Sequence, residues 1–201
     1  MLEVFSSSTF LGSDFSPNEF TDNSFLSNEF FLALEKSKSI GKGTGWIPFP
    51  IIVKEGATVV GCMPIFLKEH SYGEYIFDWA WAEAFQRHGL NYYPKLVCAI
   101  PFSPVTGPRI LAKNKELKDL LVKALEKIML QHKISSCHFL FTNKDDQKIL
   151  NKAGWMHRQG VQFRWENKEY KNFDDFLKTL SYRKRKKIRQ ERKRVAGYNL
   201  K

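Results

Sequence analysis

The stretch from position 72 to 81 holds the densest group of side chains that could take part in chemistry. It combines aromatic rings with two carboxylates, in Tyr72, Glu74, Tyr75, Asp78, Trp79 and Trp81. Such a mixture can line a pocket for a polar acceptor, because rings supply apolar surface and carboxylates fix orientation. A carboxylate placed there can also act as general base for an amine, so Asp78 and Glu74 are the candidate catalytic residues. The alternative is the buried start of a helix, with Asp78 as its cap and the rings packed in the core. Both interpretations stay open.

A second group of candidates lies in the proline-containing loop over positions 101–109. Thr106 and Arg109 could bind a phosphate or carboxylate, since a guanidinium group binds such anions with two parallel hydrogen bonds. The alternative is a rigid turn that leads into the next helix. The glycine-rich run at 41–45 precedes no helix, so it indicates a plain loop rather than a phosphate-binding one.

The histidines and cysteines form no catalytic or metal-binding pattern, so no metal site is expected. The three cysteines lie far apart, each inside an apolar run, as expected of buried, reduced thiols in a cytosolic protein. No Ser or Cys has the sequence context of an activated nucleophile. The five histidines, expected to be surface or core residues without triad or ligand spacing, are His70, His88, His132, His138 and His157.

The net charge of +11 is concentrated at one end of the chain. Residues 181–201 hold ten Lys or Arg against one acid, a net of +9, and residues 1–180 hold 22 basic against 20 acidic residues, a net of +2. Like charges one helical turn apart repel by a few tenths of a kcal/mol each, so we expect an anionic partner: the phosphates of a cofactor, tRNA or other nucleic acid, or lipid headgroups. The narrow apolar stripe of Ile188 and Val195 does not suit membrane insertion. The predicted anion-binding residues are Arg183, Lys184, Arg185, Lys186, Lys187, Arg189, Arg192 and Lys193.

The composition predicts a globular cytoplasmic protein. Hydrophobic residues make up 43% of the chain and aromatic residues 14%, which is enough for a sizeable core. The N-terminus carries Glu3 and no basic region ahead of an apolar one, so it does not resemble a signal peptide. The longest apolar runs fall short of the roughly 20 residues that a transmembrane helix needs.

The expected secondary structure alternates between strands and helices. The clearest element is a helix over positions 117–129, whose apolar residues recur at i, i+3, i+4 and i+7. Pro64 removes a hydrogen-bond donor from an apolar strand and indicates an edge or a bulge. The first 24 residues show no clear period. The full expected order is an irregular lead-in, helix 27–37, strands 51–53 and 58–67, helix 78–87, strand 95–100, helix 117–129, strand 137–141, helix 144–153, strand 161–165, a short helix after Asn172, and the basic helix.

This order predicts an α/β domain with parallel strand pairing across crossover helices. The run NKDDQKILNKAGW at 143–155 resembles the last helix of the acyl-CoA N-acyltransferase (GNAT) fold, with its Gly-aromatic ending. The resemblance implies a GNAT-like mixed central sheet flanked by helices, followed here by a basic C-terminal helix. Active members bind the cofactor pyrophosphate through backbone N–H groups of a glycine-rich loop. This chain has the loop at 103–109 instead, where Pro104 and Pro108 supply no N–H.

Longer motifs resemble bacterial FemAB-like proteins, a group often described by peptidoglycan biosynthesis. The similar runs are SYGEYIFDWAWA at 71–82, YYPKL at 92–96, PFSPVTGPR at 101–109 and SYRKRKKIR at 181–189, and the similarity spans positions 25–195. The resemblance implies acyl or aminoacyl transfer to an amine acceptor, with acyl-CoA or aminoacyl-tRNA as the donor and no metal. Lys95, inside one of these motifs, is a further expected substrate-binding residue.

The same resemblance implies that a second GNAT-like half follows the basic helix, so we expect this chain to be an N-terminal fragment. The expected parts are a lead-in at 1–24, a GNAT-like domain at 25–167, and a short helix plus the basic helix at 168–201. The alternative function is a non-catalytic module that binds nucleic acid or an acidic partner through the basic helix.

Overall fold

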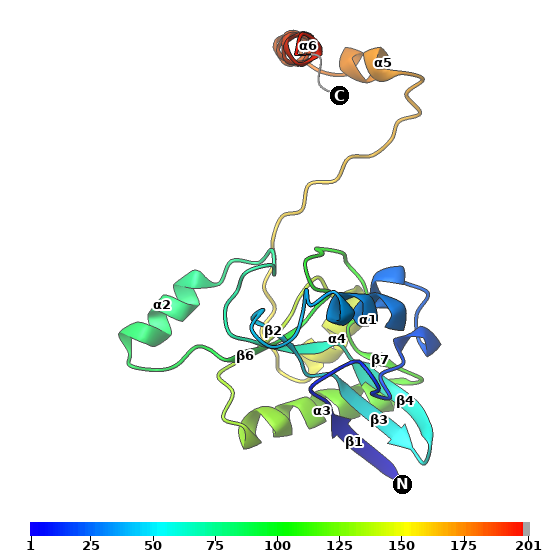
Figure 1. Cartoon of the computed structure of the whole chain (residues 1–201), viewed down its shortest axis with the longest axis vertical. Helices are drawn as coiled ribbons and strands as arrows, with labels where there is room; N and C mark the ends of the chain where they lie inside the picture. Colours follow the sequence, from blue (N-terminus) through cyan, green and yellow to red (C-terminus); the bar gives the residue numbers. More distant parts are fainter. Residues whose placement is uncertain (199–201) are drawn as a thin grey trace. The chain divides into compact units, whose positions relative to one another are not determined.

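The computed structural model describes residues 1–198 of the chain, which divides into two compact units (Figure 1). The first unit covers residues 1–157 and the second begins at Arg158. Every strand within residues 1–198 belongs to the first unit.

Two four-stranded sheets form the centre of the first unit. One has the order β1 (Leu2–Ser6), β3 (Ile51–Glu55), β4 (Thr58–Met63) and β7 (Leu111–Ala112), with antiparallel neighbours throughout. The other has the order β2 (Trp46–Pro48), β5 (Ile65–Lys68), β6 (Lys95–Cys98) and β8 (Cys137–Phe139). Its β6–β8 pair is parallel and the rest are antiparallel. The predicted mixed α/β fold is confirmed, with the strands divided between two sheets.

The division occurs at Pro64, where the sequence indicated an edge or a bulge. The single strand expected over 58–67 is two strands, because proline cannot donate a hydrogen bond to the sheet ladder. On one side of Pro64, β4 pairs with β3; on the other side, β5 pairs with β6. This switch carries Lys68, the last residue of β5, next to Lys95 on the second sheet.

The predicted helices are present, and their ends follow from their capping residues. The Ser27 hydroxyl accepts from the Phe30 N–H at the start of α1 (Asn28–Lys36). The helix α3 (Lys115–Gln131) buries its apolar face. It lies in the connection between β6 and β8, the two strands that pair in parallel. After α4 (Lys144–Lys152), Gly154 adopts a positive φ of 85°, as a helix-ending glycine does. The remaining helix of this unit is α2 (Trp79–Arg87).

Two expectations about irregular and regular segments were wrong. Residues 1–24 are not an irregular lead-in, because they form β1 and two short 3-10 helices (Pro17–Glu19 and Ser24–Leu26), and bury Phe10 and Phe15 against Phe31. The strand expected at 161–165 is absent: this segment is exposed and pairs with no strand within residues 1–198. The alternation of apolar and polar residues in this segment predicted a strand. A strand also needs a neighbouring strand to pair with, and this segment has none within residues 1–198.

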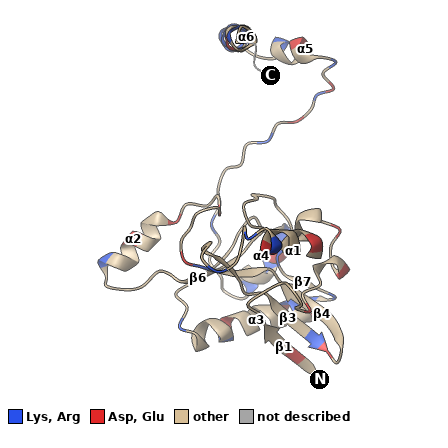
Figure 2. Ribbon diagram, in the orientation of Figure 1, with Lys and Arg blue, Asp and Glu red and all other residues tan. Residues whose placement is uncertain are grey.

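The second unit contains the two helices that the sequence predicted there. The Asn172 side chain caps α5 (Phe173–Lys178) by accepting from the Asp175 N–H at 3.0 Å. The basic helix α6 (Tyr182–Ala196) buries no residue, and Figure 2 shows Lys and Arg along it. The Arg192 guanidinium lies 4.4 Å from the centre of the Phe173 ring. None of the helices within residues 1–198 combines the length and the apolar character required to span a bilayer.

Candidate functional site

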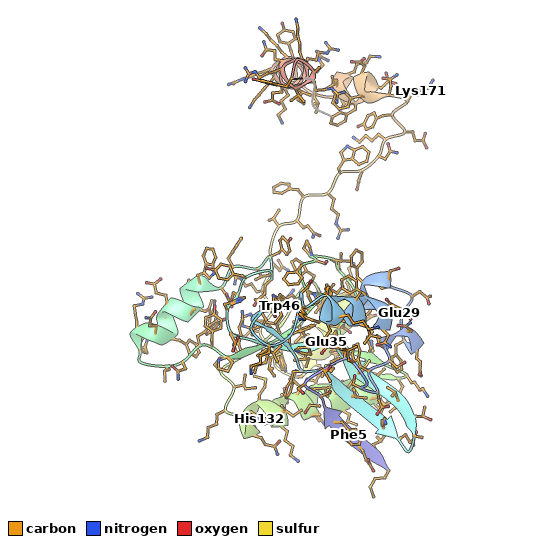
Figure 3. The ribbon with its side chains drawn as sticks, in the orientation of Figure 1. Phe5, Glu29, Glu35, Trp46, His132 and Lys171 are labelled. Carbon is orange, nitrogen blue, oxygen red and sulfur yellow. The ribbon has the colours of Figure 1, made fainter. Side chains whose placement is uncertain are left out.

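Two fully buried lysines lie side by side at the ends of adjacent strands. Lys68 ends β5, Lys95 begins β6, and the two are direct partners in the antiparallel register. Trp46, whose ring borders Lys68, lies inside this unit (Figure 3). Like charges opposite each other repel, and a buried ammonium group is costly unless it is paired. The fold therefore has to bring acidic groups to this point.

Those acidic groups come from the loop between β5 and α2. The Lys95 Nζ donates to Glu74 Oε2 at 2.8 Å and to Ser71 Oγ at 2.9 Å, and it also forms an ion pair with Asp78 Oδ2. Glu74 is 2% exposed and Asp78 1%. The Ser71 hydroxyl is also 2.8 Å from the hydroxyl of Tyr93. One ammonium group thus binds three side chains of the loop and holds the loop to β6.

Lys68 has different surroundings. Its Nζ lies 3.7 Å from the centre of the Trp46 ring and donates to the Tyr72 carbonyl at 3.3 Å. The Trp46 indole N–H donates to the same carbonyl at 3.0 Å. Burial lowers the pKa of Lys68 to about 7, although the nearby carboxylate of Glu74 opposes this shift. A substantial fraction of Lys68 is therefore neutral near pH 7.

The two carboxylates have pKa values shifted in opposite directions. Burial raises the pKa of Glu74, against the attraction of Lys95. Burial also acts to raise the pKa of Asp78, but its hydrogen bonds, led by the one from Lys95, outweigh burial and hold that pKa below its ordinary value. Neighbouring acids whose environments separate their pKa values are typical of sites that carry out acid–base chemistry.

Tyr92 and His138 complete the group that we call the Lys95 cluster: Lys68, Ser71, Glu74, Asp78, Tyr92, Tyr93, Lys95 and His138. The Tyr92 hydroxyl donates to Asp78 Oδ2 at 2.5 Å and lies 3.2 Å from His138 Nε2. The His138 Nδ1 is 3.8 Å from the same Asp78 oxygen. Sequence reasoning assigned no function to either residue, because the parallel pairing of β8 with β6 is what brings position 138 here.

One oxygen of each carboxylate is left without a donor. Glu74 Oε1 and Asp78 Oδ1 are buried and accept no hydrogen bond from any group within residues 1–198. Buried acceptors normally have a donor, and leaving one unmade costs about 1–3 kcal/mol. Each of these oxygens can accept a hydrogen bond from a further N–H or O–H donor.

The aromatic rings of the same loop point outward. Trp79 and Trp81 are 57% and 49% exposed, and α2 buries no residue and stands away from the sheets (Figure 1). The alternative of core-packed rings is therefore wrong. Asp78 occupies the N-cap position of α2, but its side chain makes no capping hydrogen bond, because its carboxylate belongs to the Lys95 cluster. The other exposed rings of the loop are Tyr72, Tyr75 and Phe77.

The loop conformation depends on Gly73. This residue has a φ of +79°, and a Cβ atom there would lie 2.8 Å from the Phe102 ring. Tyr75 also has a positive φ, of 59°, which is uncommon for a residue with a side chain. These two residues turn the chain so that Glu74 and Asp78 face inward while the rings face outward.

Arg109 and Thr106 share no hydrogen bond with the Lys95 cluster within the described part of the chain. The Arg109 guanidinium is buried and donates to the carbonyls of Leu140 at 2.9 Å and Val105 at 2.6 Å. Its backbone N–H binds the Asp146 carboxylate. These contacts hold the 101–109 loop in place and explain why an arginine is needed there. Substrate binding by Thr106 and Arg109 stays a prediction.

The predicted anion-binding residues lie on α6, within the second unit. Two of their side chains form exposed ion pairs: Lys187 with Glu191 at 3.8 Å, and Arg189 with Asp174 at 3.3 Å. Exposed pairs of this kind contribute at most about 1 kcal/mol, so they do not prevent these cations from binding a ligand. No cluster of three or more His, Cys, Asp or Glu suited to a metal occurs within residues 1–198.

Of the comparisons with known proteins, the one with family models agrees with the resemblance seen in the motifs. No curated protein sequence matches the chain. Among solved structures, the chain is similar to an aminoglycoside acetyltransferase from an uncultured soil metagenomic sample, crystallised in complex with trehalose. The TM-score is 0.41 at 10% identity, covering 83% of this chain and 97% of that one. A family model named FemAB-like, described as peptidoglycan biosynthesis/recognition, matches residues 12–201. The chain therefore belongs to the FemAB-like family.

Proposed function

We propose that this chain carries the acceptor site of an acyl- or aminoacyl-transferase, in which the Lys95 cluster activates an amine. The observation that supports this best is the pair of buried carboxylates, Glu74 and Asp78, each with one oxygen that lacks a donor. Their position beneath a loop of exposed rings fits a polar acceptor. Membership of the FemAB-like family supports the same class of reaction.

The proposed chemistry begins with the charge of the acceptor. An amine is protonated near neutral pH and must lose a proton before its lone pair can attack an acyl carbon. Its ammonium form would donate to Asp78 Oδ1 and Glu74 Oε1. The lowered pKa of Asp78 keeps its carboxylate ionised, and in the proposed step this carboxylate accepts one proton. Lys95 contacts both carboxylates and positions them. The amine nitrogen then bonds to the acyl carbon, the donor's C–S or C–O bond breaks, and a proton goes to the leaving group.

The donor is proposed to be acyl-CoA or an aminoacyl-tRNA, and the 101–109 loop does not fit its phosphates. The guanidinium donors of Arg109 already bind backbone carbonyls, and Pro104 and Pro108 supply no N–H. We therefore assign no contact with the donor to this loop. That a second GNAT-like half follows, and binds the donor, stays a prediction that the reading frame beyond Lys201 would test.

The decisive experiment is transfer of a radiolabelled acyl or aminoacyl group to a panel of amines, with Asp78→Asn as the test variant. We expect kcat to fall by about 100-fold or more, as general-base removal usually does. Asp145→Asn, on the exposed surface of α4, is the matched control and should keep its activity. Normal transfer by Asp78→Asn would remove Asp78 as the base. No transfer from any donor to any amine, with the following half present where the reading frame continues, would overturn the proposed function.

A second candidate function is binding of a nucleic acid or an acidic partner through α6. The observation that favours it is an exposed helix in a segment with a net charge of +9, far more than its two ion pairs neutralise. A gel-shift titration of tRNA at several salt concentrations tests this candidate. A flat response to salt, or no shift, would rule it out.

A further inference from the structure

We propose that Tyr92 and His138 form a proton path between the buried Asp78 carboxylate and solvent. This inference rests on the proposed function, because it concerns the proton that Asp78 removes from the acceptor. Both residues act through Asp78, so they are positioning residues rather than groups that touch the acceptor.

The reaction itself creates the need for such a path. Transfer of an acyl group to an ammonium ion gives an amide, and of the two protons that nitrogen loses, only one is taken up by the leaving group. One net proton must therefore reach solvent in each turnover. Asp78 is 1% exposed, and the bound acceptor would occupy its Oδ1 side, so the proton needs a route to bulk water on the Oδ2 side.

The geometry connects Asp78 to the surface in two steps. The Tyr92 hydroxyl is 2.5 Å from Asp78 Oδ2, and the His138 Nε2 is 3.2 Å from the same hydroxyl. Exposure rises along the path, from 1% for Asp78 and 4% for Tyr92 to 24% for the His138 side chain. His138 is therefore the most exposed member of the path.

The resting hydrogen bonds also fix which atoms hold the protons. A phenol has one proton, and Tyr92 gives it to Asp78, so the Tyr92 oxygen accepts from His138 Nε2–H. Once Asp78 is protonated, it no longer attracts the Tyr92 proton. The carboxyl group rotates to bring the proton it received on Oδ1 toward Tyr92, and His138 exchanges with water to its Nδ1–H tautomer, which frees Nε2 as an acceptor. The Tyr92 proton then passes to His138 Nε2 as the Asp78 proton passes to the Tyr92 oxygen. The imidazolium ion then releases a proton to water, and every group returns to its starting charge.

The surrounding charges favour this outward movement. Lys95 forms an ion pair with Asp78 Oδ2 and so stabilises the ionised carboxylate that remains after the proton has left. The regenerated Asp78 carboxylate, 3.8 Å from His138 Nδ1, stabilises the imidazolium ion while it exists. The other titratable groups of the cluster are Lys68 on β5, Glu74 on the loop, and Tyr93 before β6, whose hydroxyl binds Ser71. Burial raises the pKa of Tyr92, so its hydroxyl stays neutral between proton transfers.

Chemical rescue tests the path in the transfer reaction. We expect His138→Ala to lower kcat by about 10- to 100-fold without a matching change in KM, and added imidazole to restore most of the rate. Tyr92→Phe should lower kcat to a similar extent, but imidazole should not restore it, because the broken link lies between His138 and Asp78. His157→Ala, at an exposed histidine outside the cluster, is the control and should match the parent protein. An unchanged rate and pH profile for His138→Ala, or equal rescue of both variants, would overturn the proposal.

A titration that requires no activity separates this proposal from the proposed function. The imidazole nitrogen shifts of His138 are followed by NMR in the parent chain and in Asp78→Asn. If the two groups are coupled, loss of the carboxylate lowers the titration midpoint of His138, because the imidazolium ion loses a nearby negative charge. Equal midpoints would contradict the path even where transfer is observed. A shifted midpoint together with no transfer would support the coupled pair and overturn only the proposed reaction.

Discussion

Replacing Lys95 with methionine tests whether this ammonium group holds the candidate site together. The change keeps the length of the side chain but removes the donor to Glu74 and Ser71 and the ion pair with Asp78. Removing one partner of a buried ion pair costs about 3–5 kcal/mol, because the other charge stays buried without compensation. Lys95 compensates two carboxylates, while Lys68 remains nearby to offset part of the loss. We therefore expect a loss of about 3–5 kcal/mol at pH 7, rather than the sum of three separate contacts.

The measurement is urea unfolding followed by tryptophan fluorescence, with linear extrapolation to water. Lys127→Met makes the same chemical change at an exposed position of α3 and should alter the free energy of unfolding by no more than about 0.5 kcal/mol. Because the total stability of a domain is about 5–15 kcal/mol, Lys95→Met could leave the protein largely unfolded. The triple variant that also carries Glu74→Gln and Asp78→Asn has no buried charge without a partner at these positions. It should recover at least about 2 kcal/mol relative to Lys95→Met.

The pH dependence supplies a further check on this reasoning. Without Lys95, the folded-state pKa values of the two carboxyl groups should lie above their unfolded values. Such groups destabilise the fold at high pH, and the penalty disappears as pH falls below the unfolded pKa of about 4. The deficit of Lys95→Met should therefore shrink between pH 7 and pH 4. A loss of less than about 1 kcal/mol at pH 7, or a triple variant less stable than Lys95→Met, would refute this account.

Three further predictions concern other features of the chain. Gly73→Ala should lower the free energy of unfolding by about 1–3 kcal/mol and reduce transfer activity, because the positive φ of Gly73 disfavours a side chain and the new Cβ meets Phe102. Urea unfolding and the transfer assay measure the two effects, and Gly160→Ala, where a Cβ meets open space, is the control. Burial lowers the pKa of Lys68 from 10.5 to about 7, so between these pH values the unfolded chain binds more protons than the folded chain, and stability should rise with pH. Lys68→Met should remove this rise, which urea unfolding at several pH values would measure. If α6 binds single-stranded regions of RNA, the logarithm of affinity should fall with the logarithm of salt concentration by about 0.7 per phosphate contacted, and changing Lys186 and Lys193 to Gln should reduce that slope.

Periodicity and capping residues predicted most of the helices, since these signals act within a few residues of sequence. The apolar repeat of α3 and the helix-ending Gly154 are examples. Segments whose structure depends on distant partners were missed. Phe10 and Phe15 show no period, yet both are buried because Phe31 and other aromatic rings surround them. The 161–165 segment is the opposite case. Its local sequence pattern predicted a strand, but within residues 1–198 no other strand pairs with it, and it forms none.

The candidate site could be predicted only where its residues lie close together in sequence. Glu74 and Asp78 share one loop, and their spacing singled them out as a pair. Lys68, Tyr92 and His138 come from separate segments, and the register of β5, β6 and β8 decides that they meet. One local signal was present: Lys68 ends an otherwise apolar strand, and a charged residue at a strand end can face the core.

The cost of the Lys95 cluster is itself an argument for function. Apolar residues of similar volume often stabilise a fold as well as a buried ion pair does, so stability alone does not require Lys95, Glu74 and Asp78 at this position. The arrangement also leaves two carboxylate oxygens without donors, which a purely structural network would be expected to satisfy. Separated pKa values, unfilled acceptors and a histidine that reaches solvent are all features that proton transfer needs and folding does not. Charge-neutral replacement of the whole cluster should therefore preserve the fold while abolishing transfer, and retained activity in that variant would contradict this reasoning.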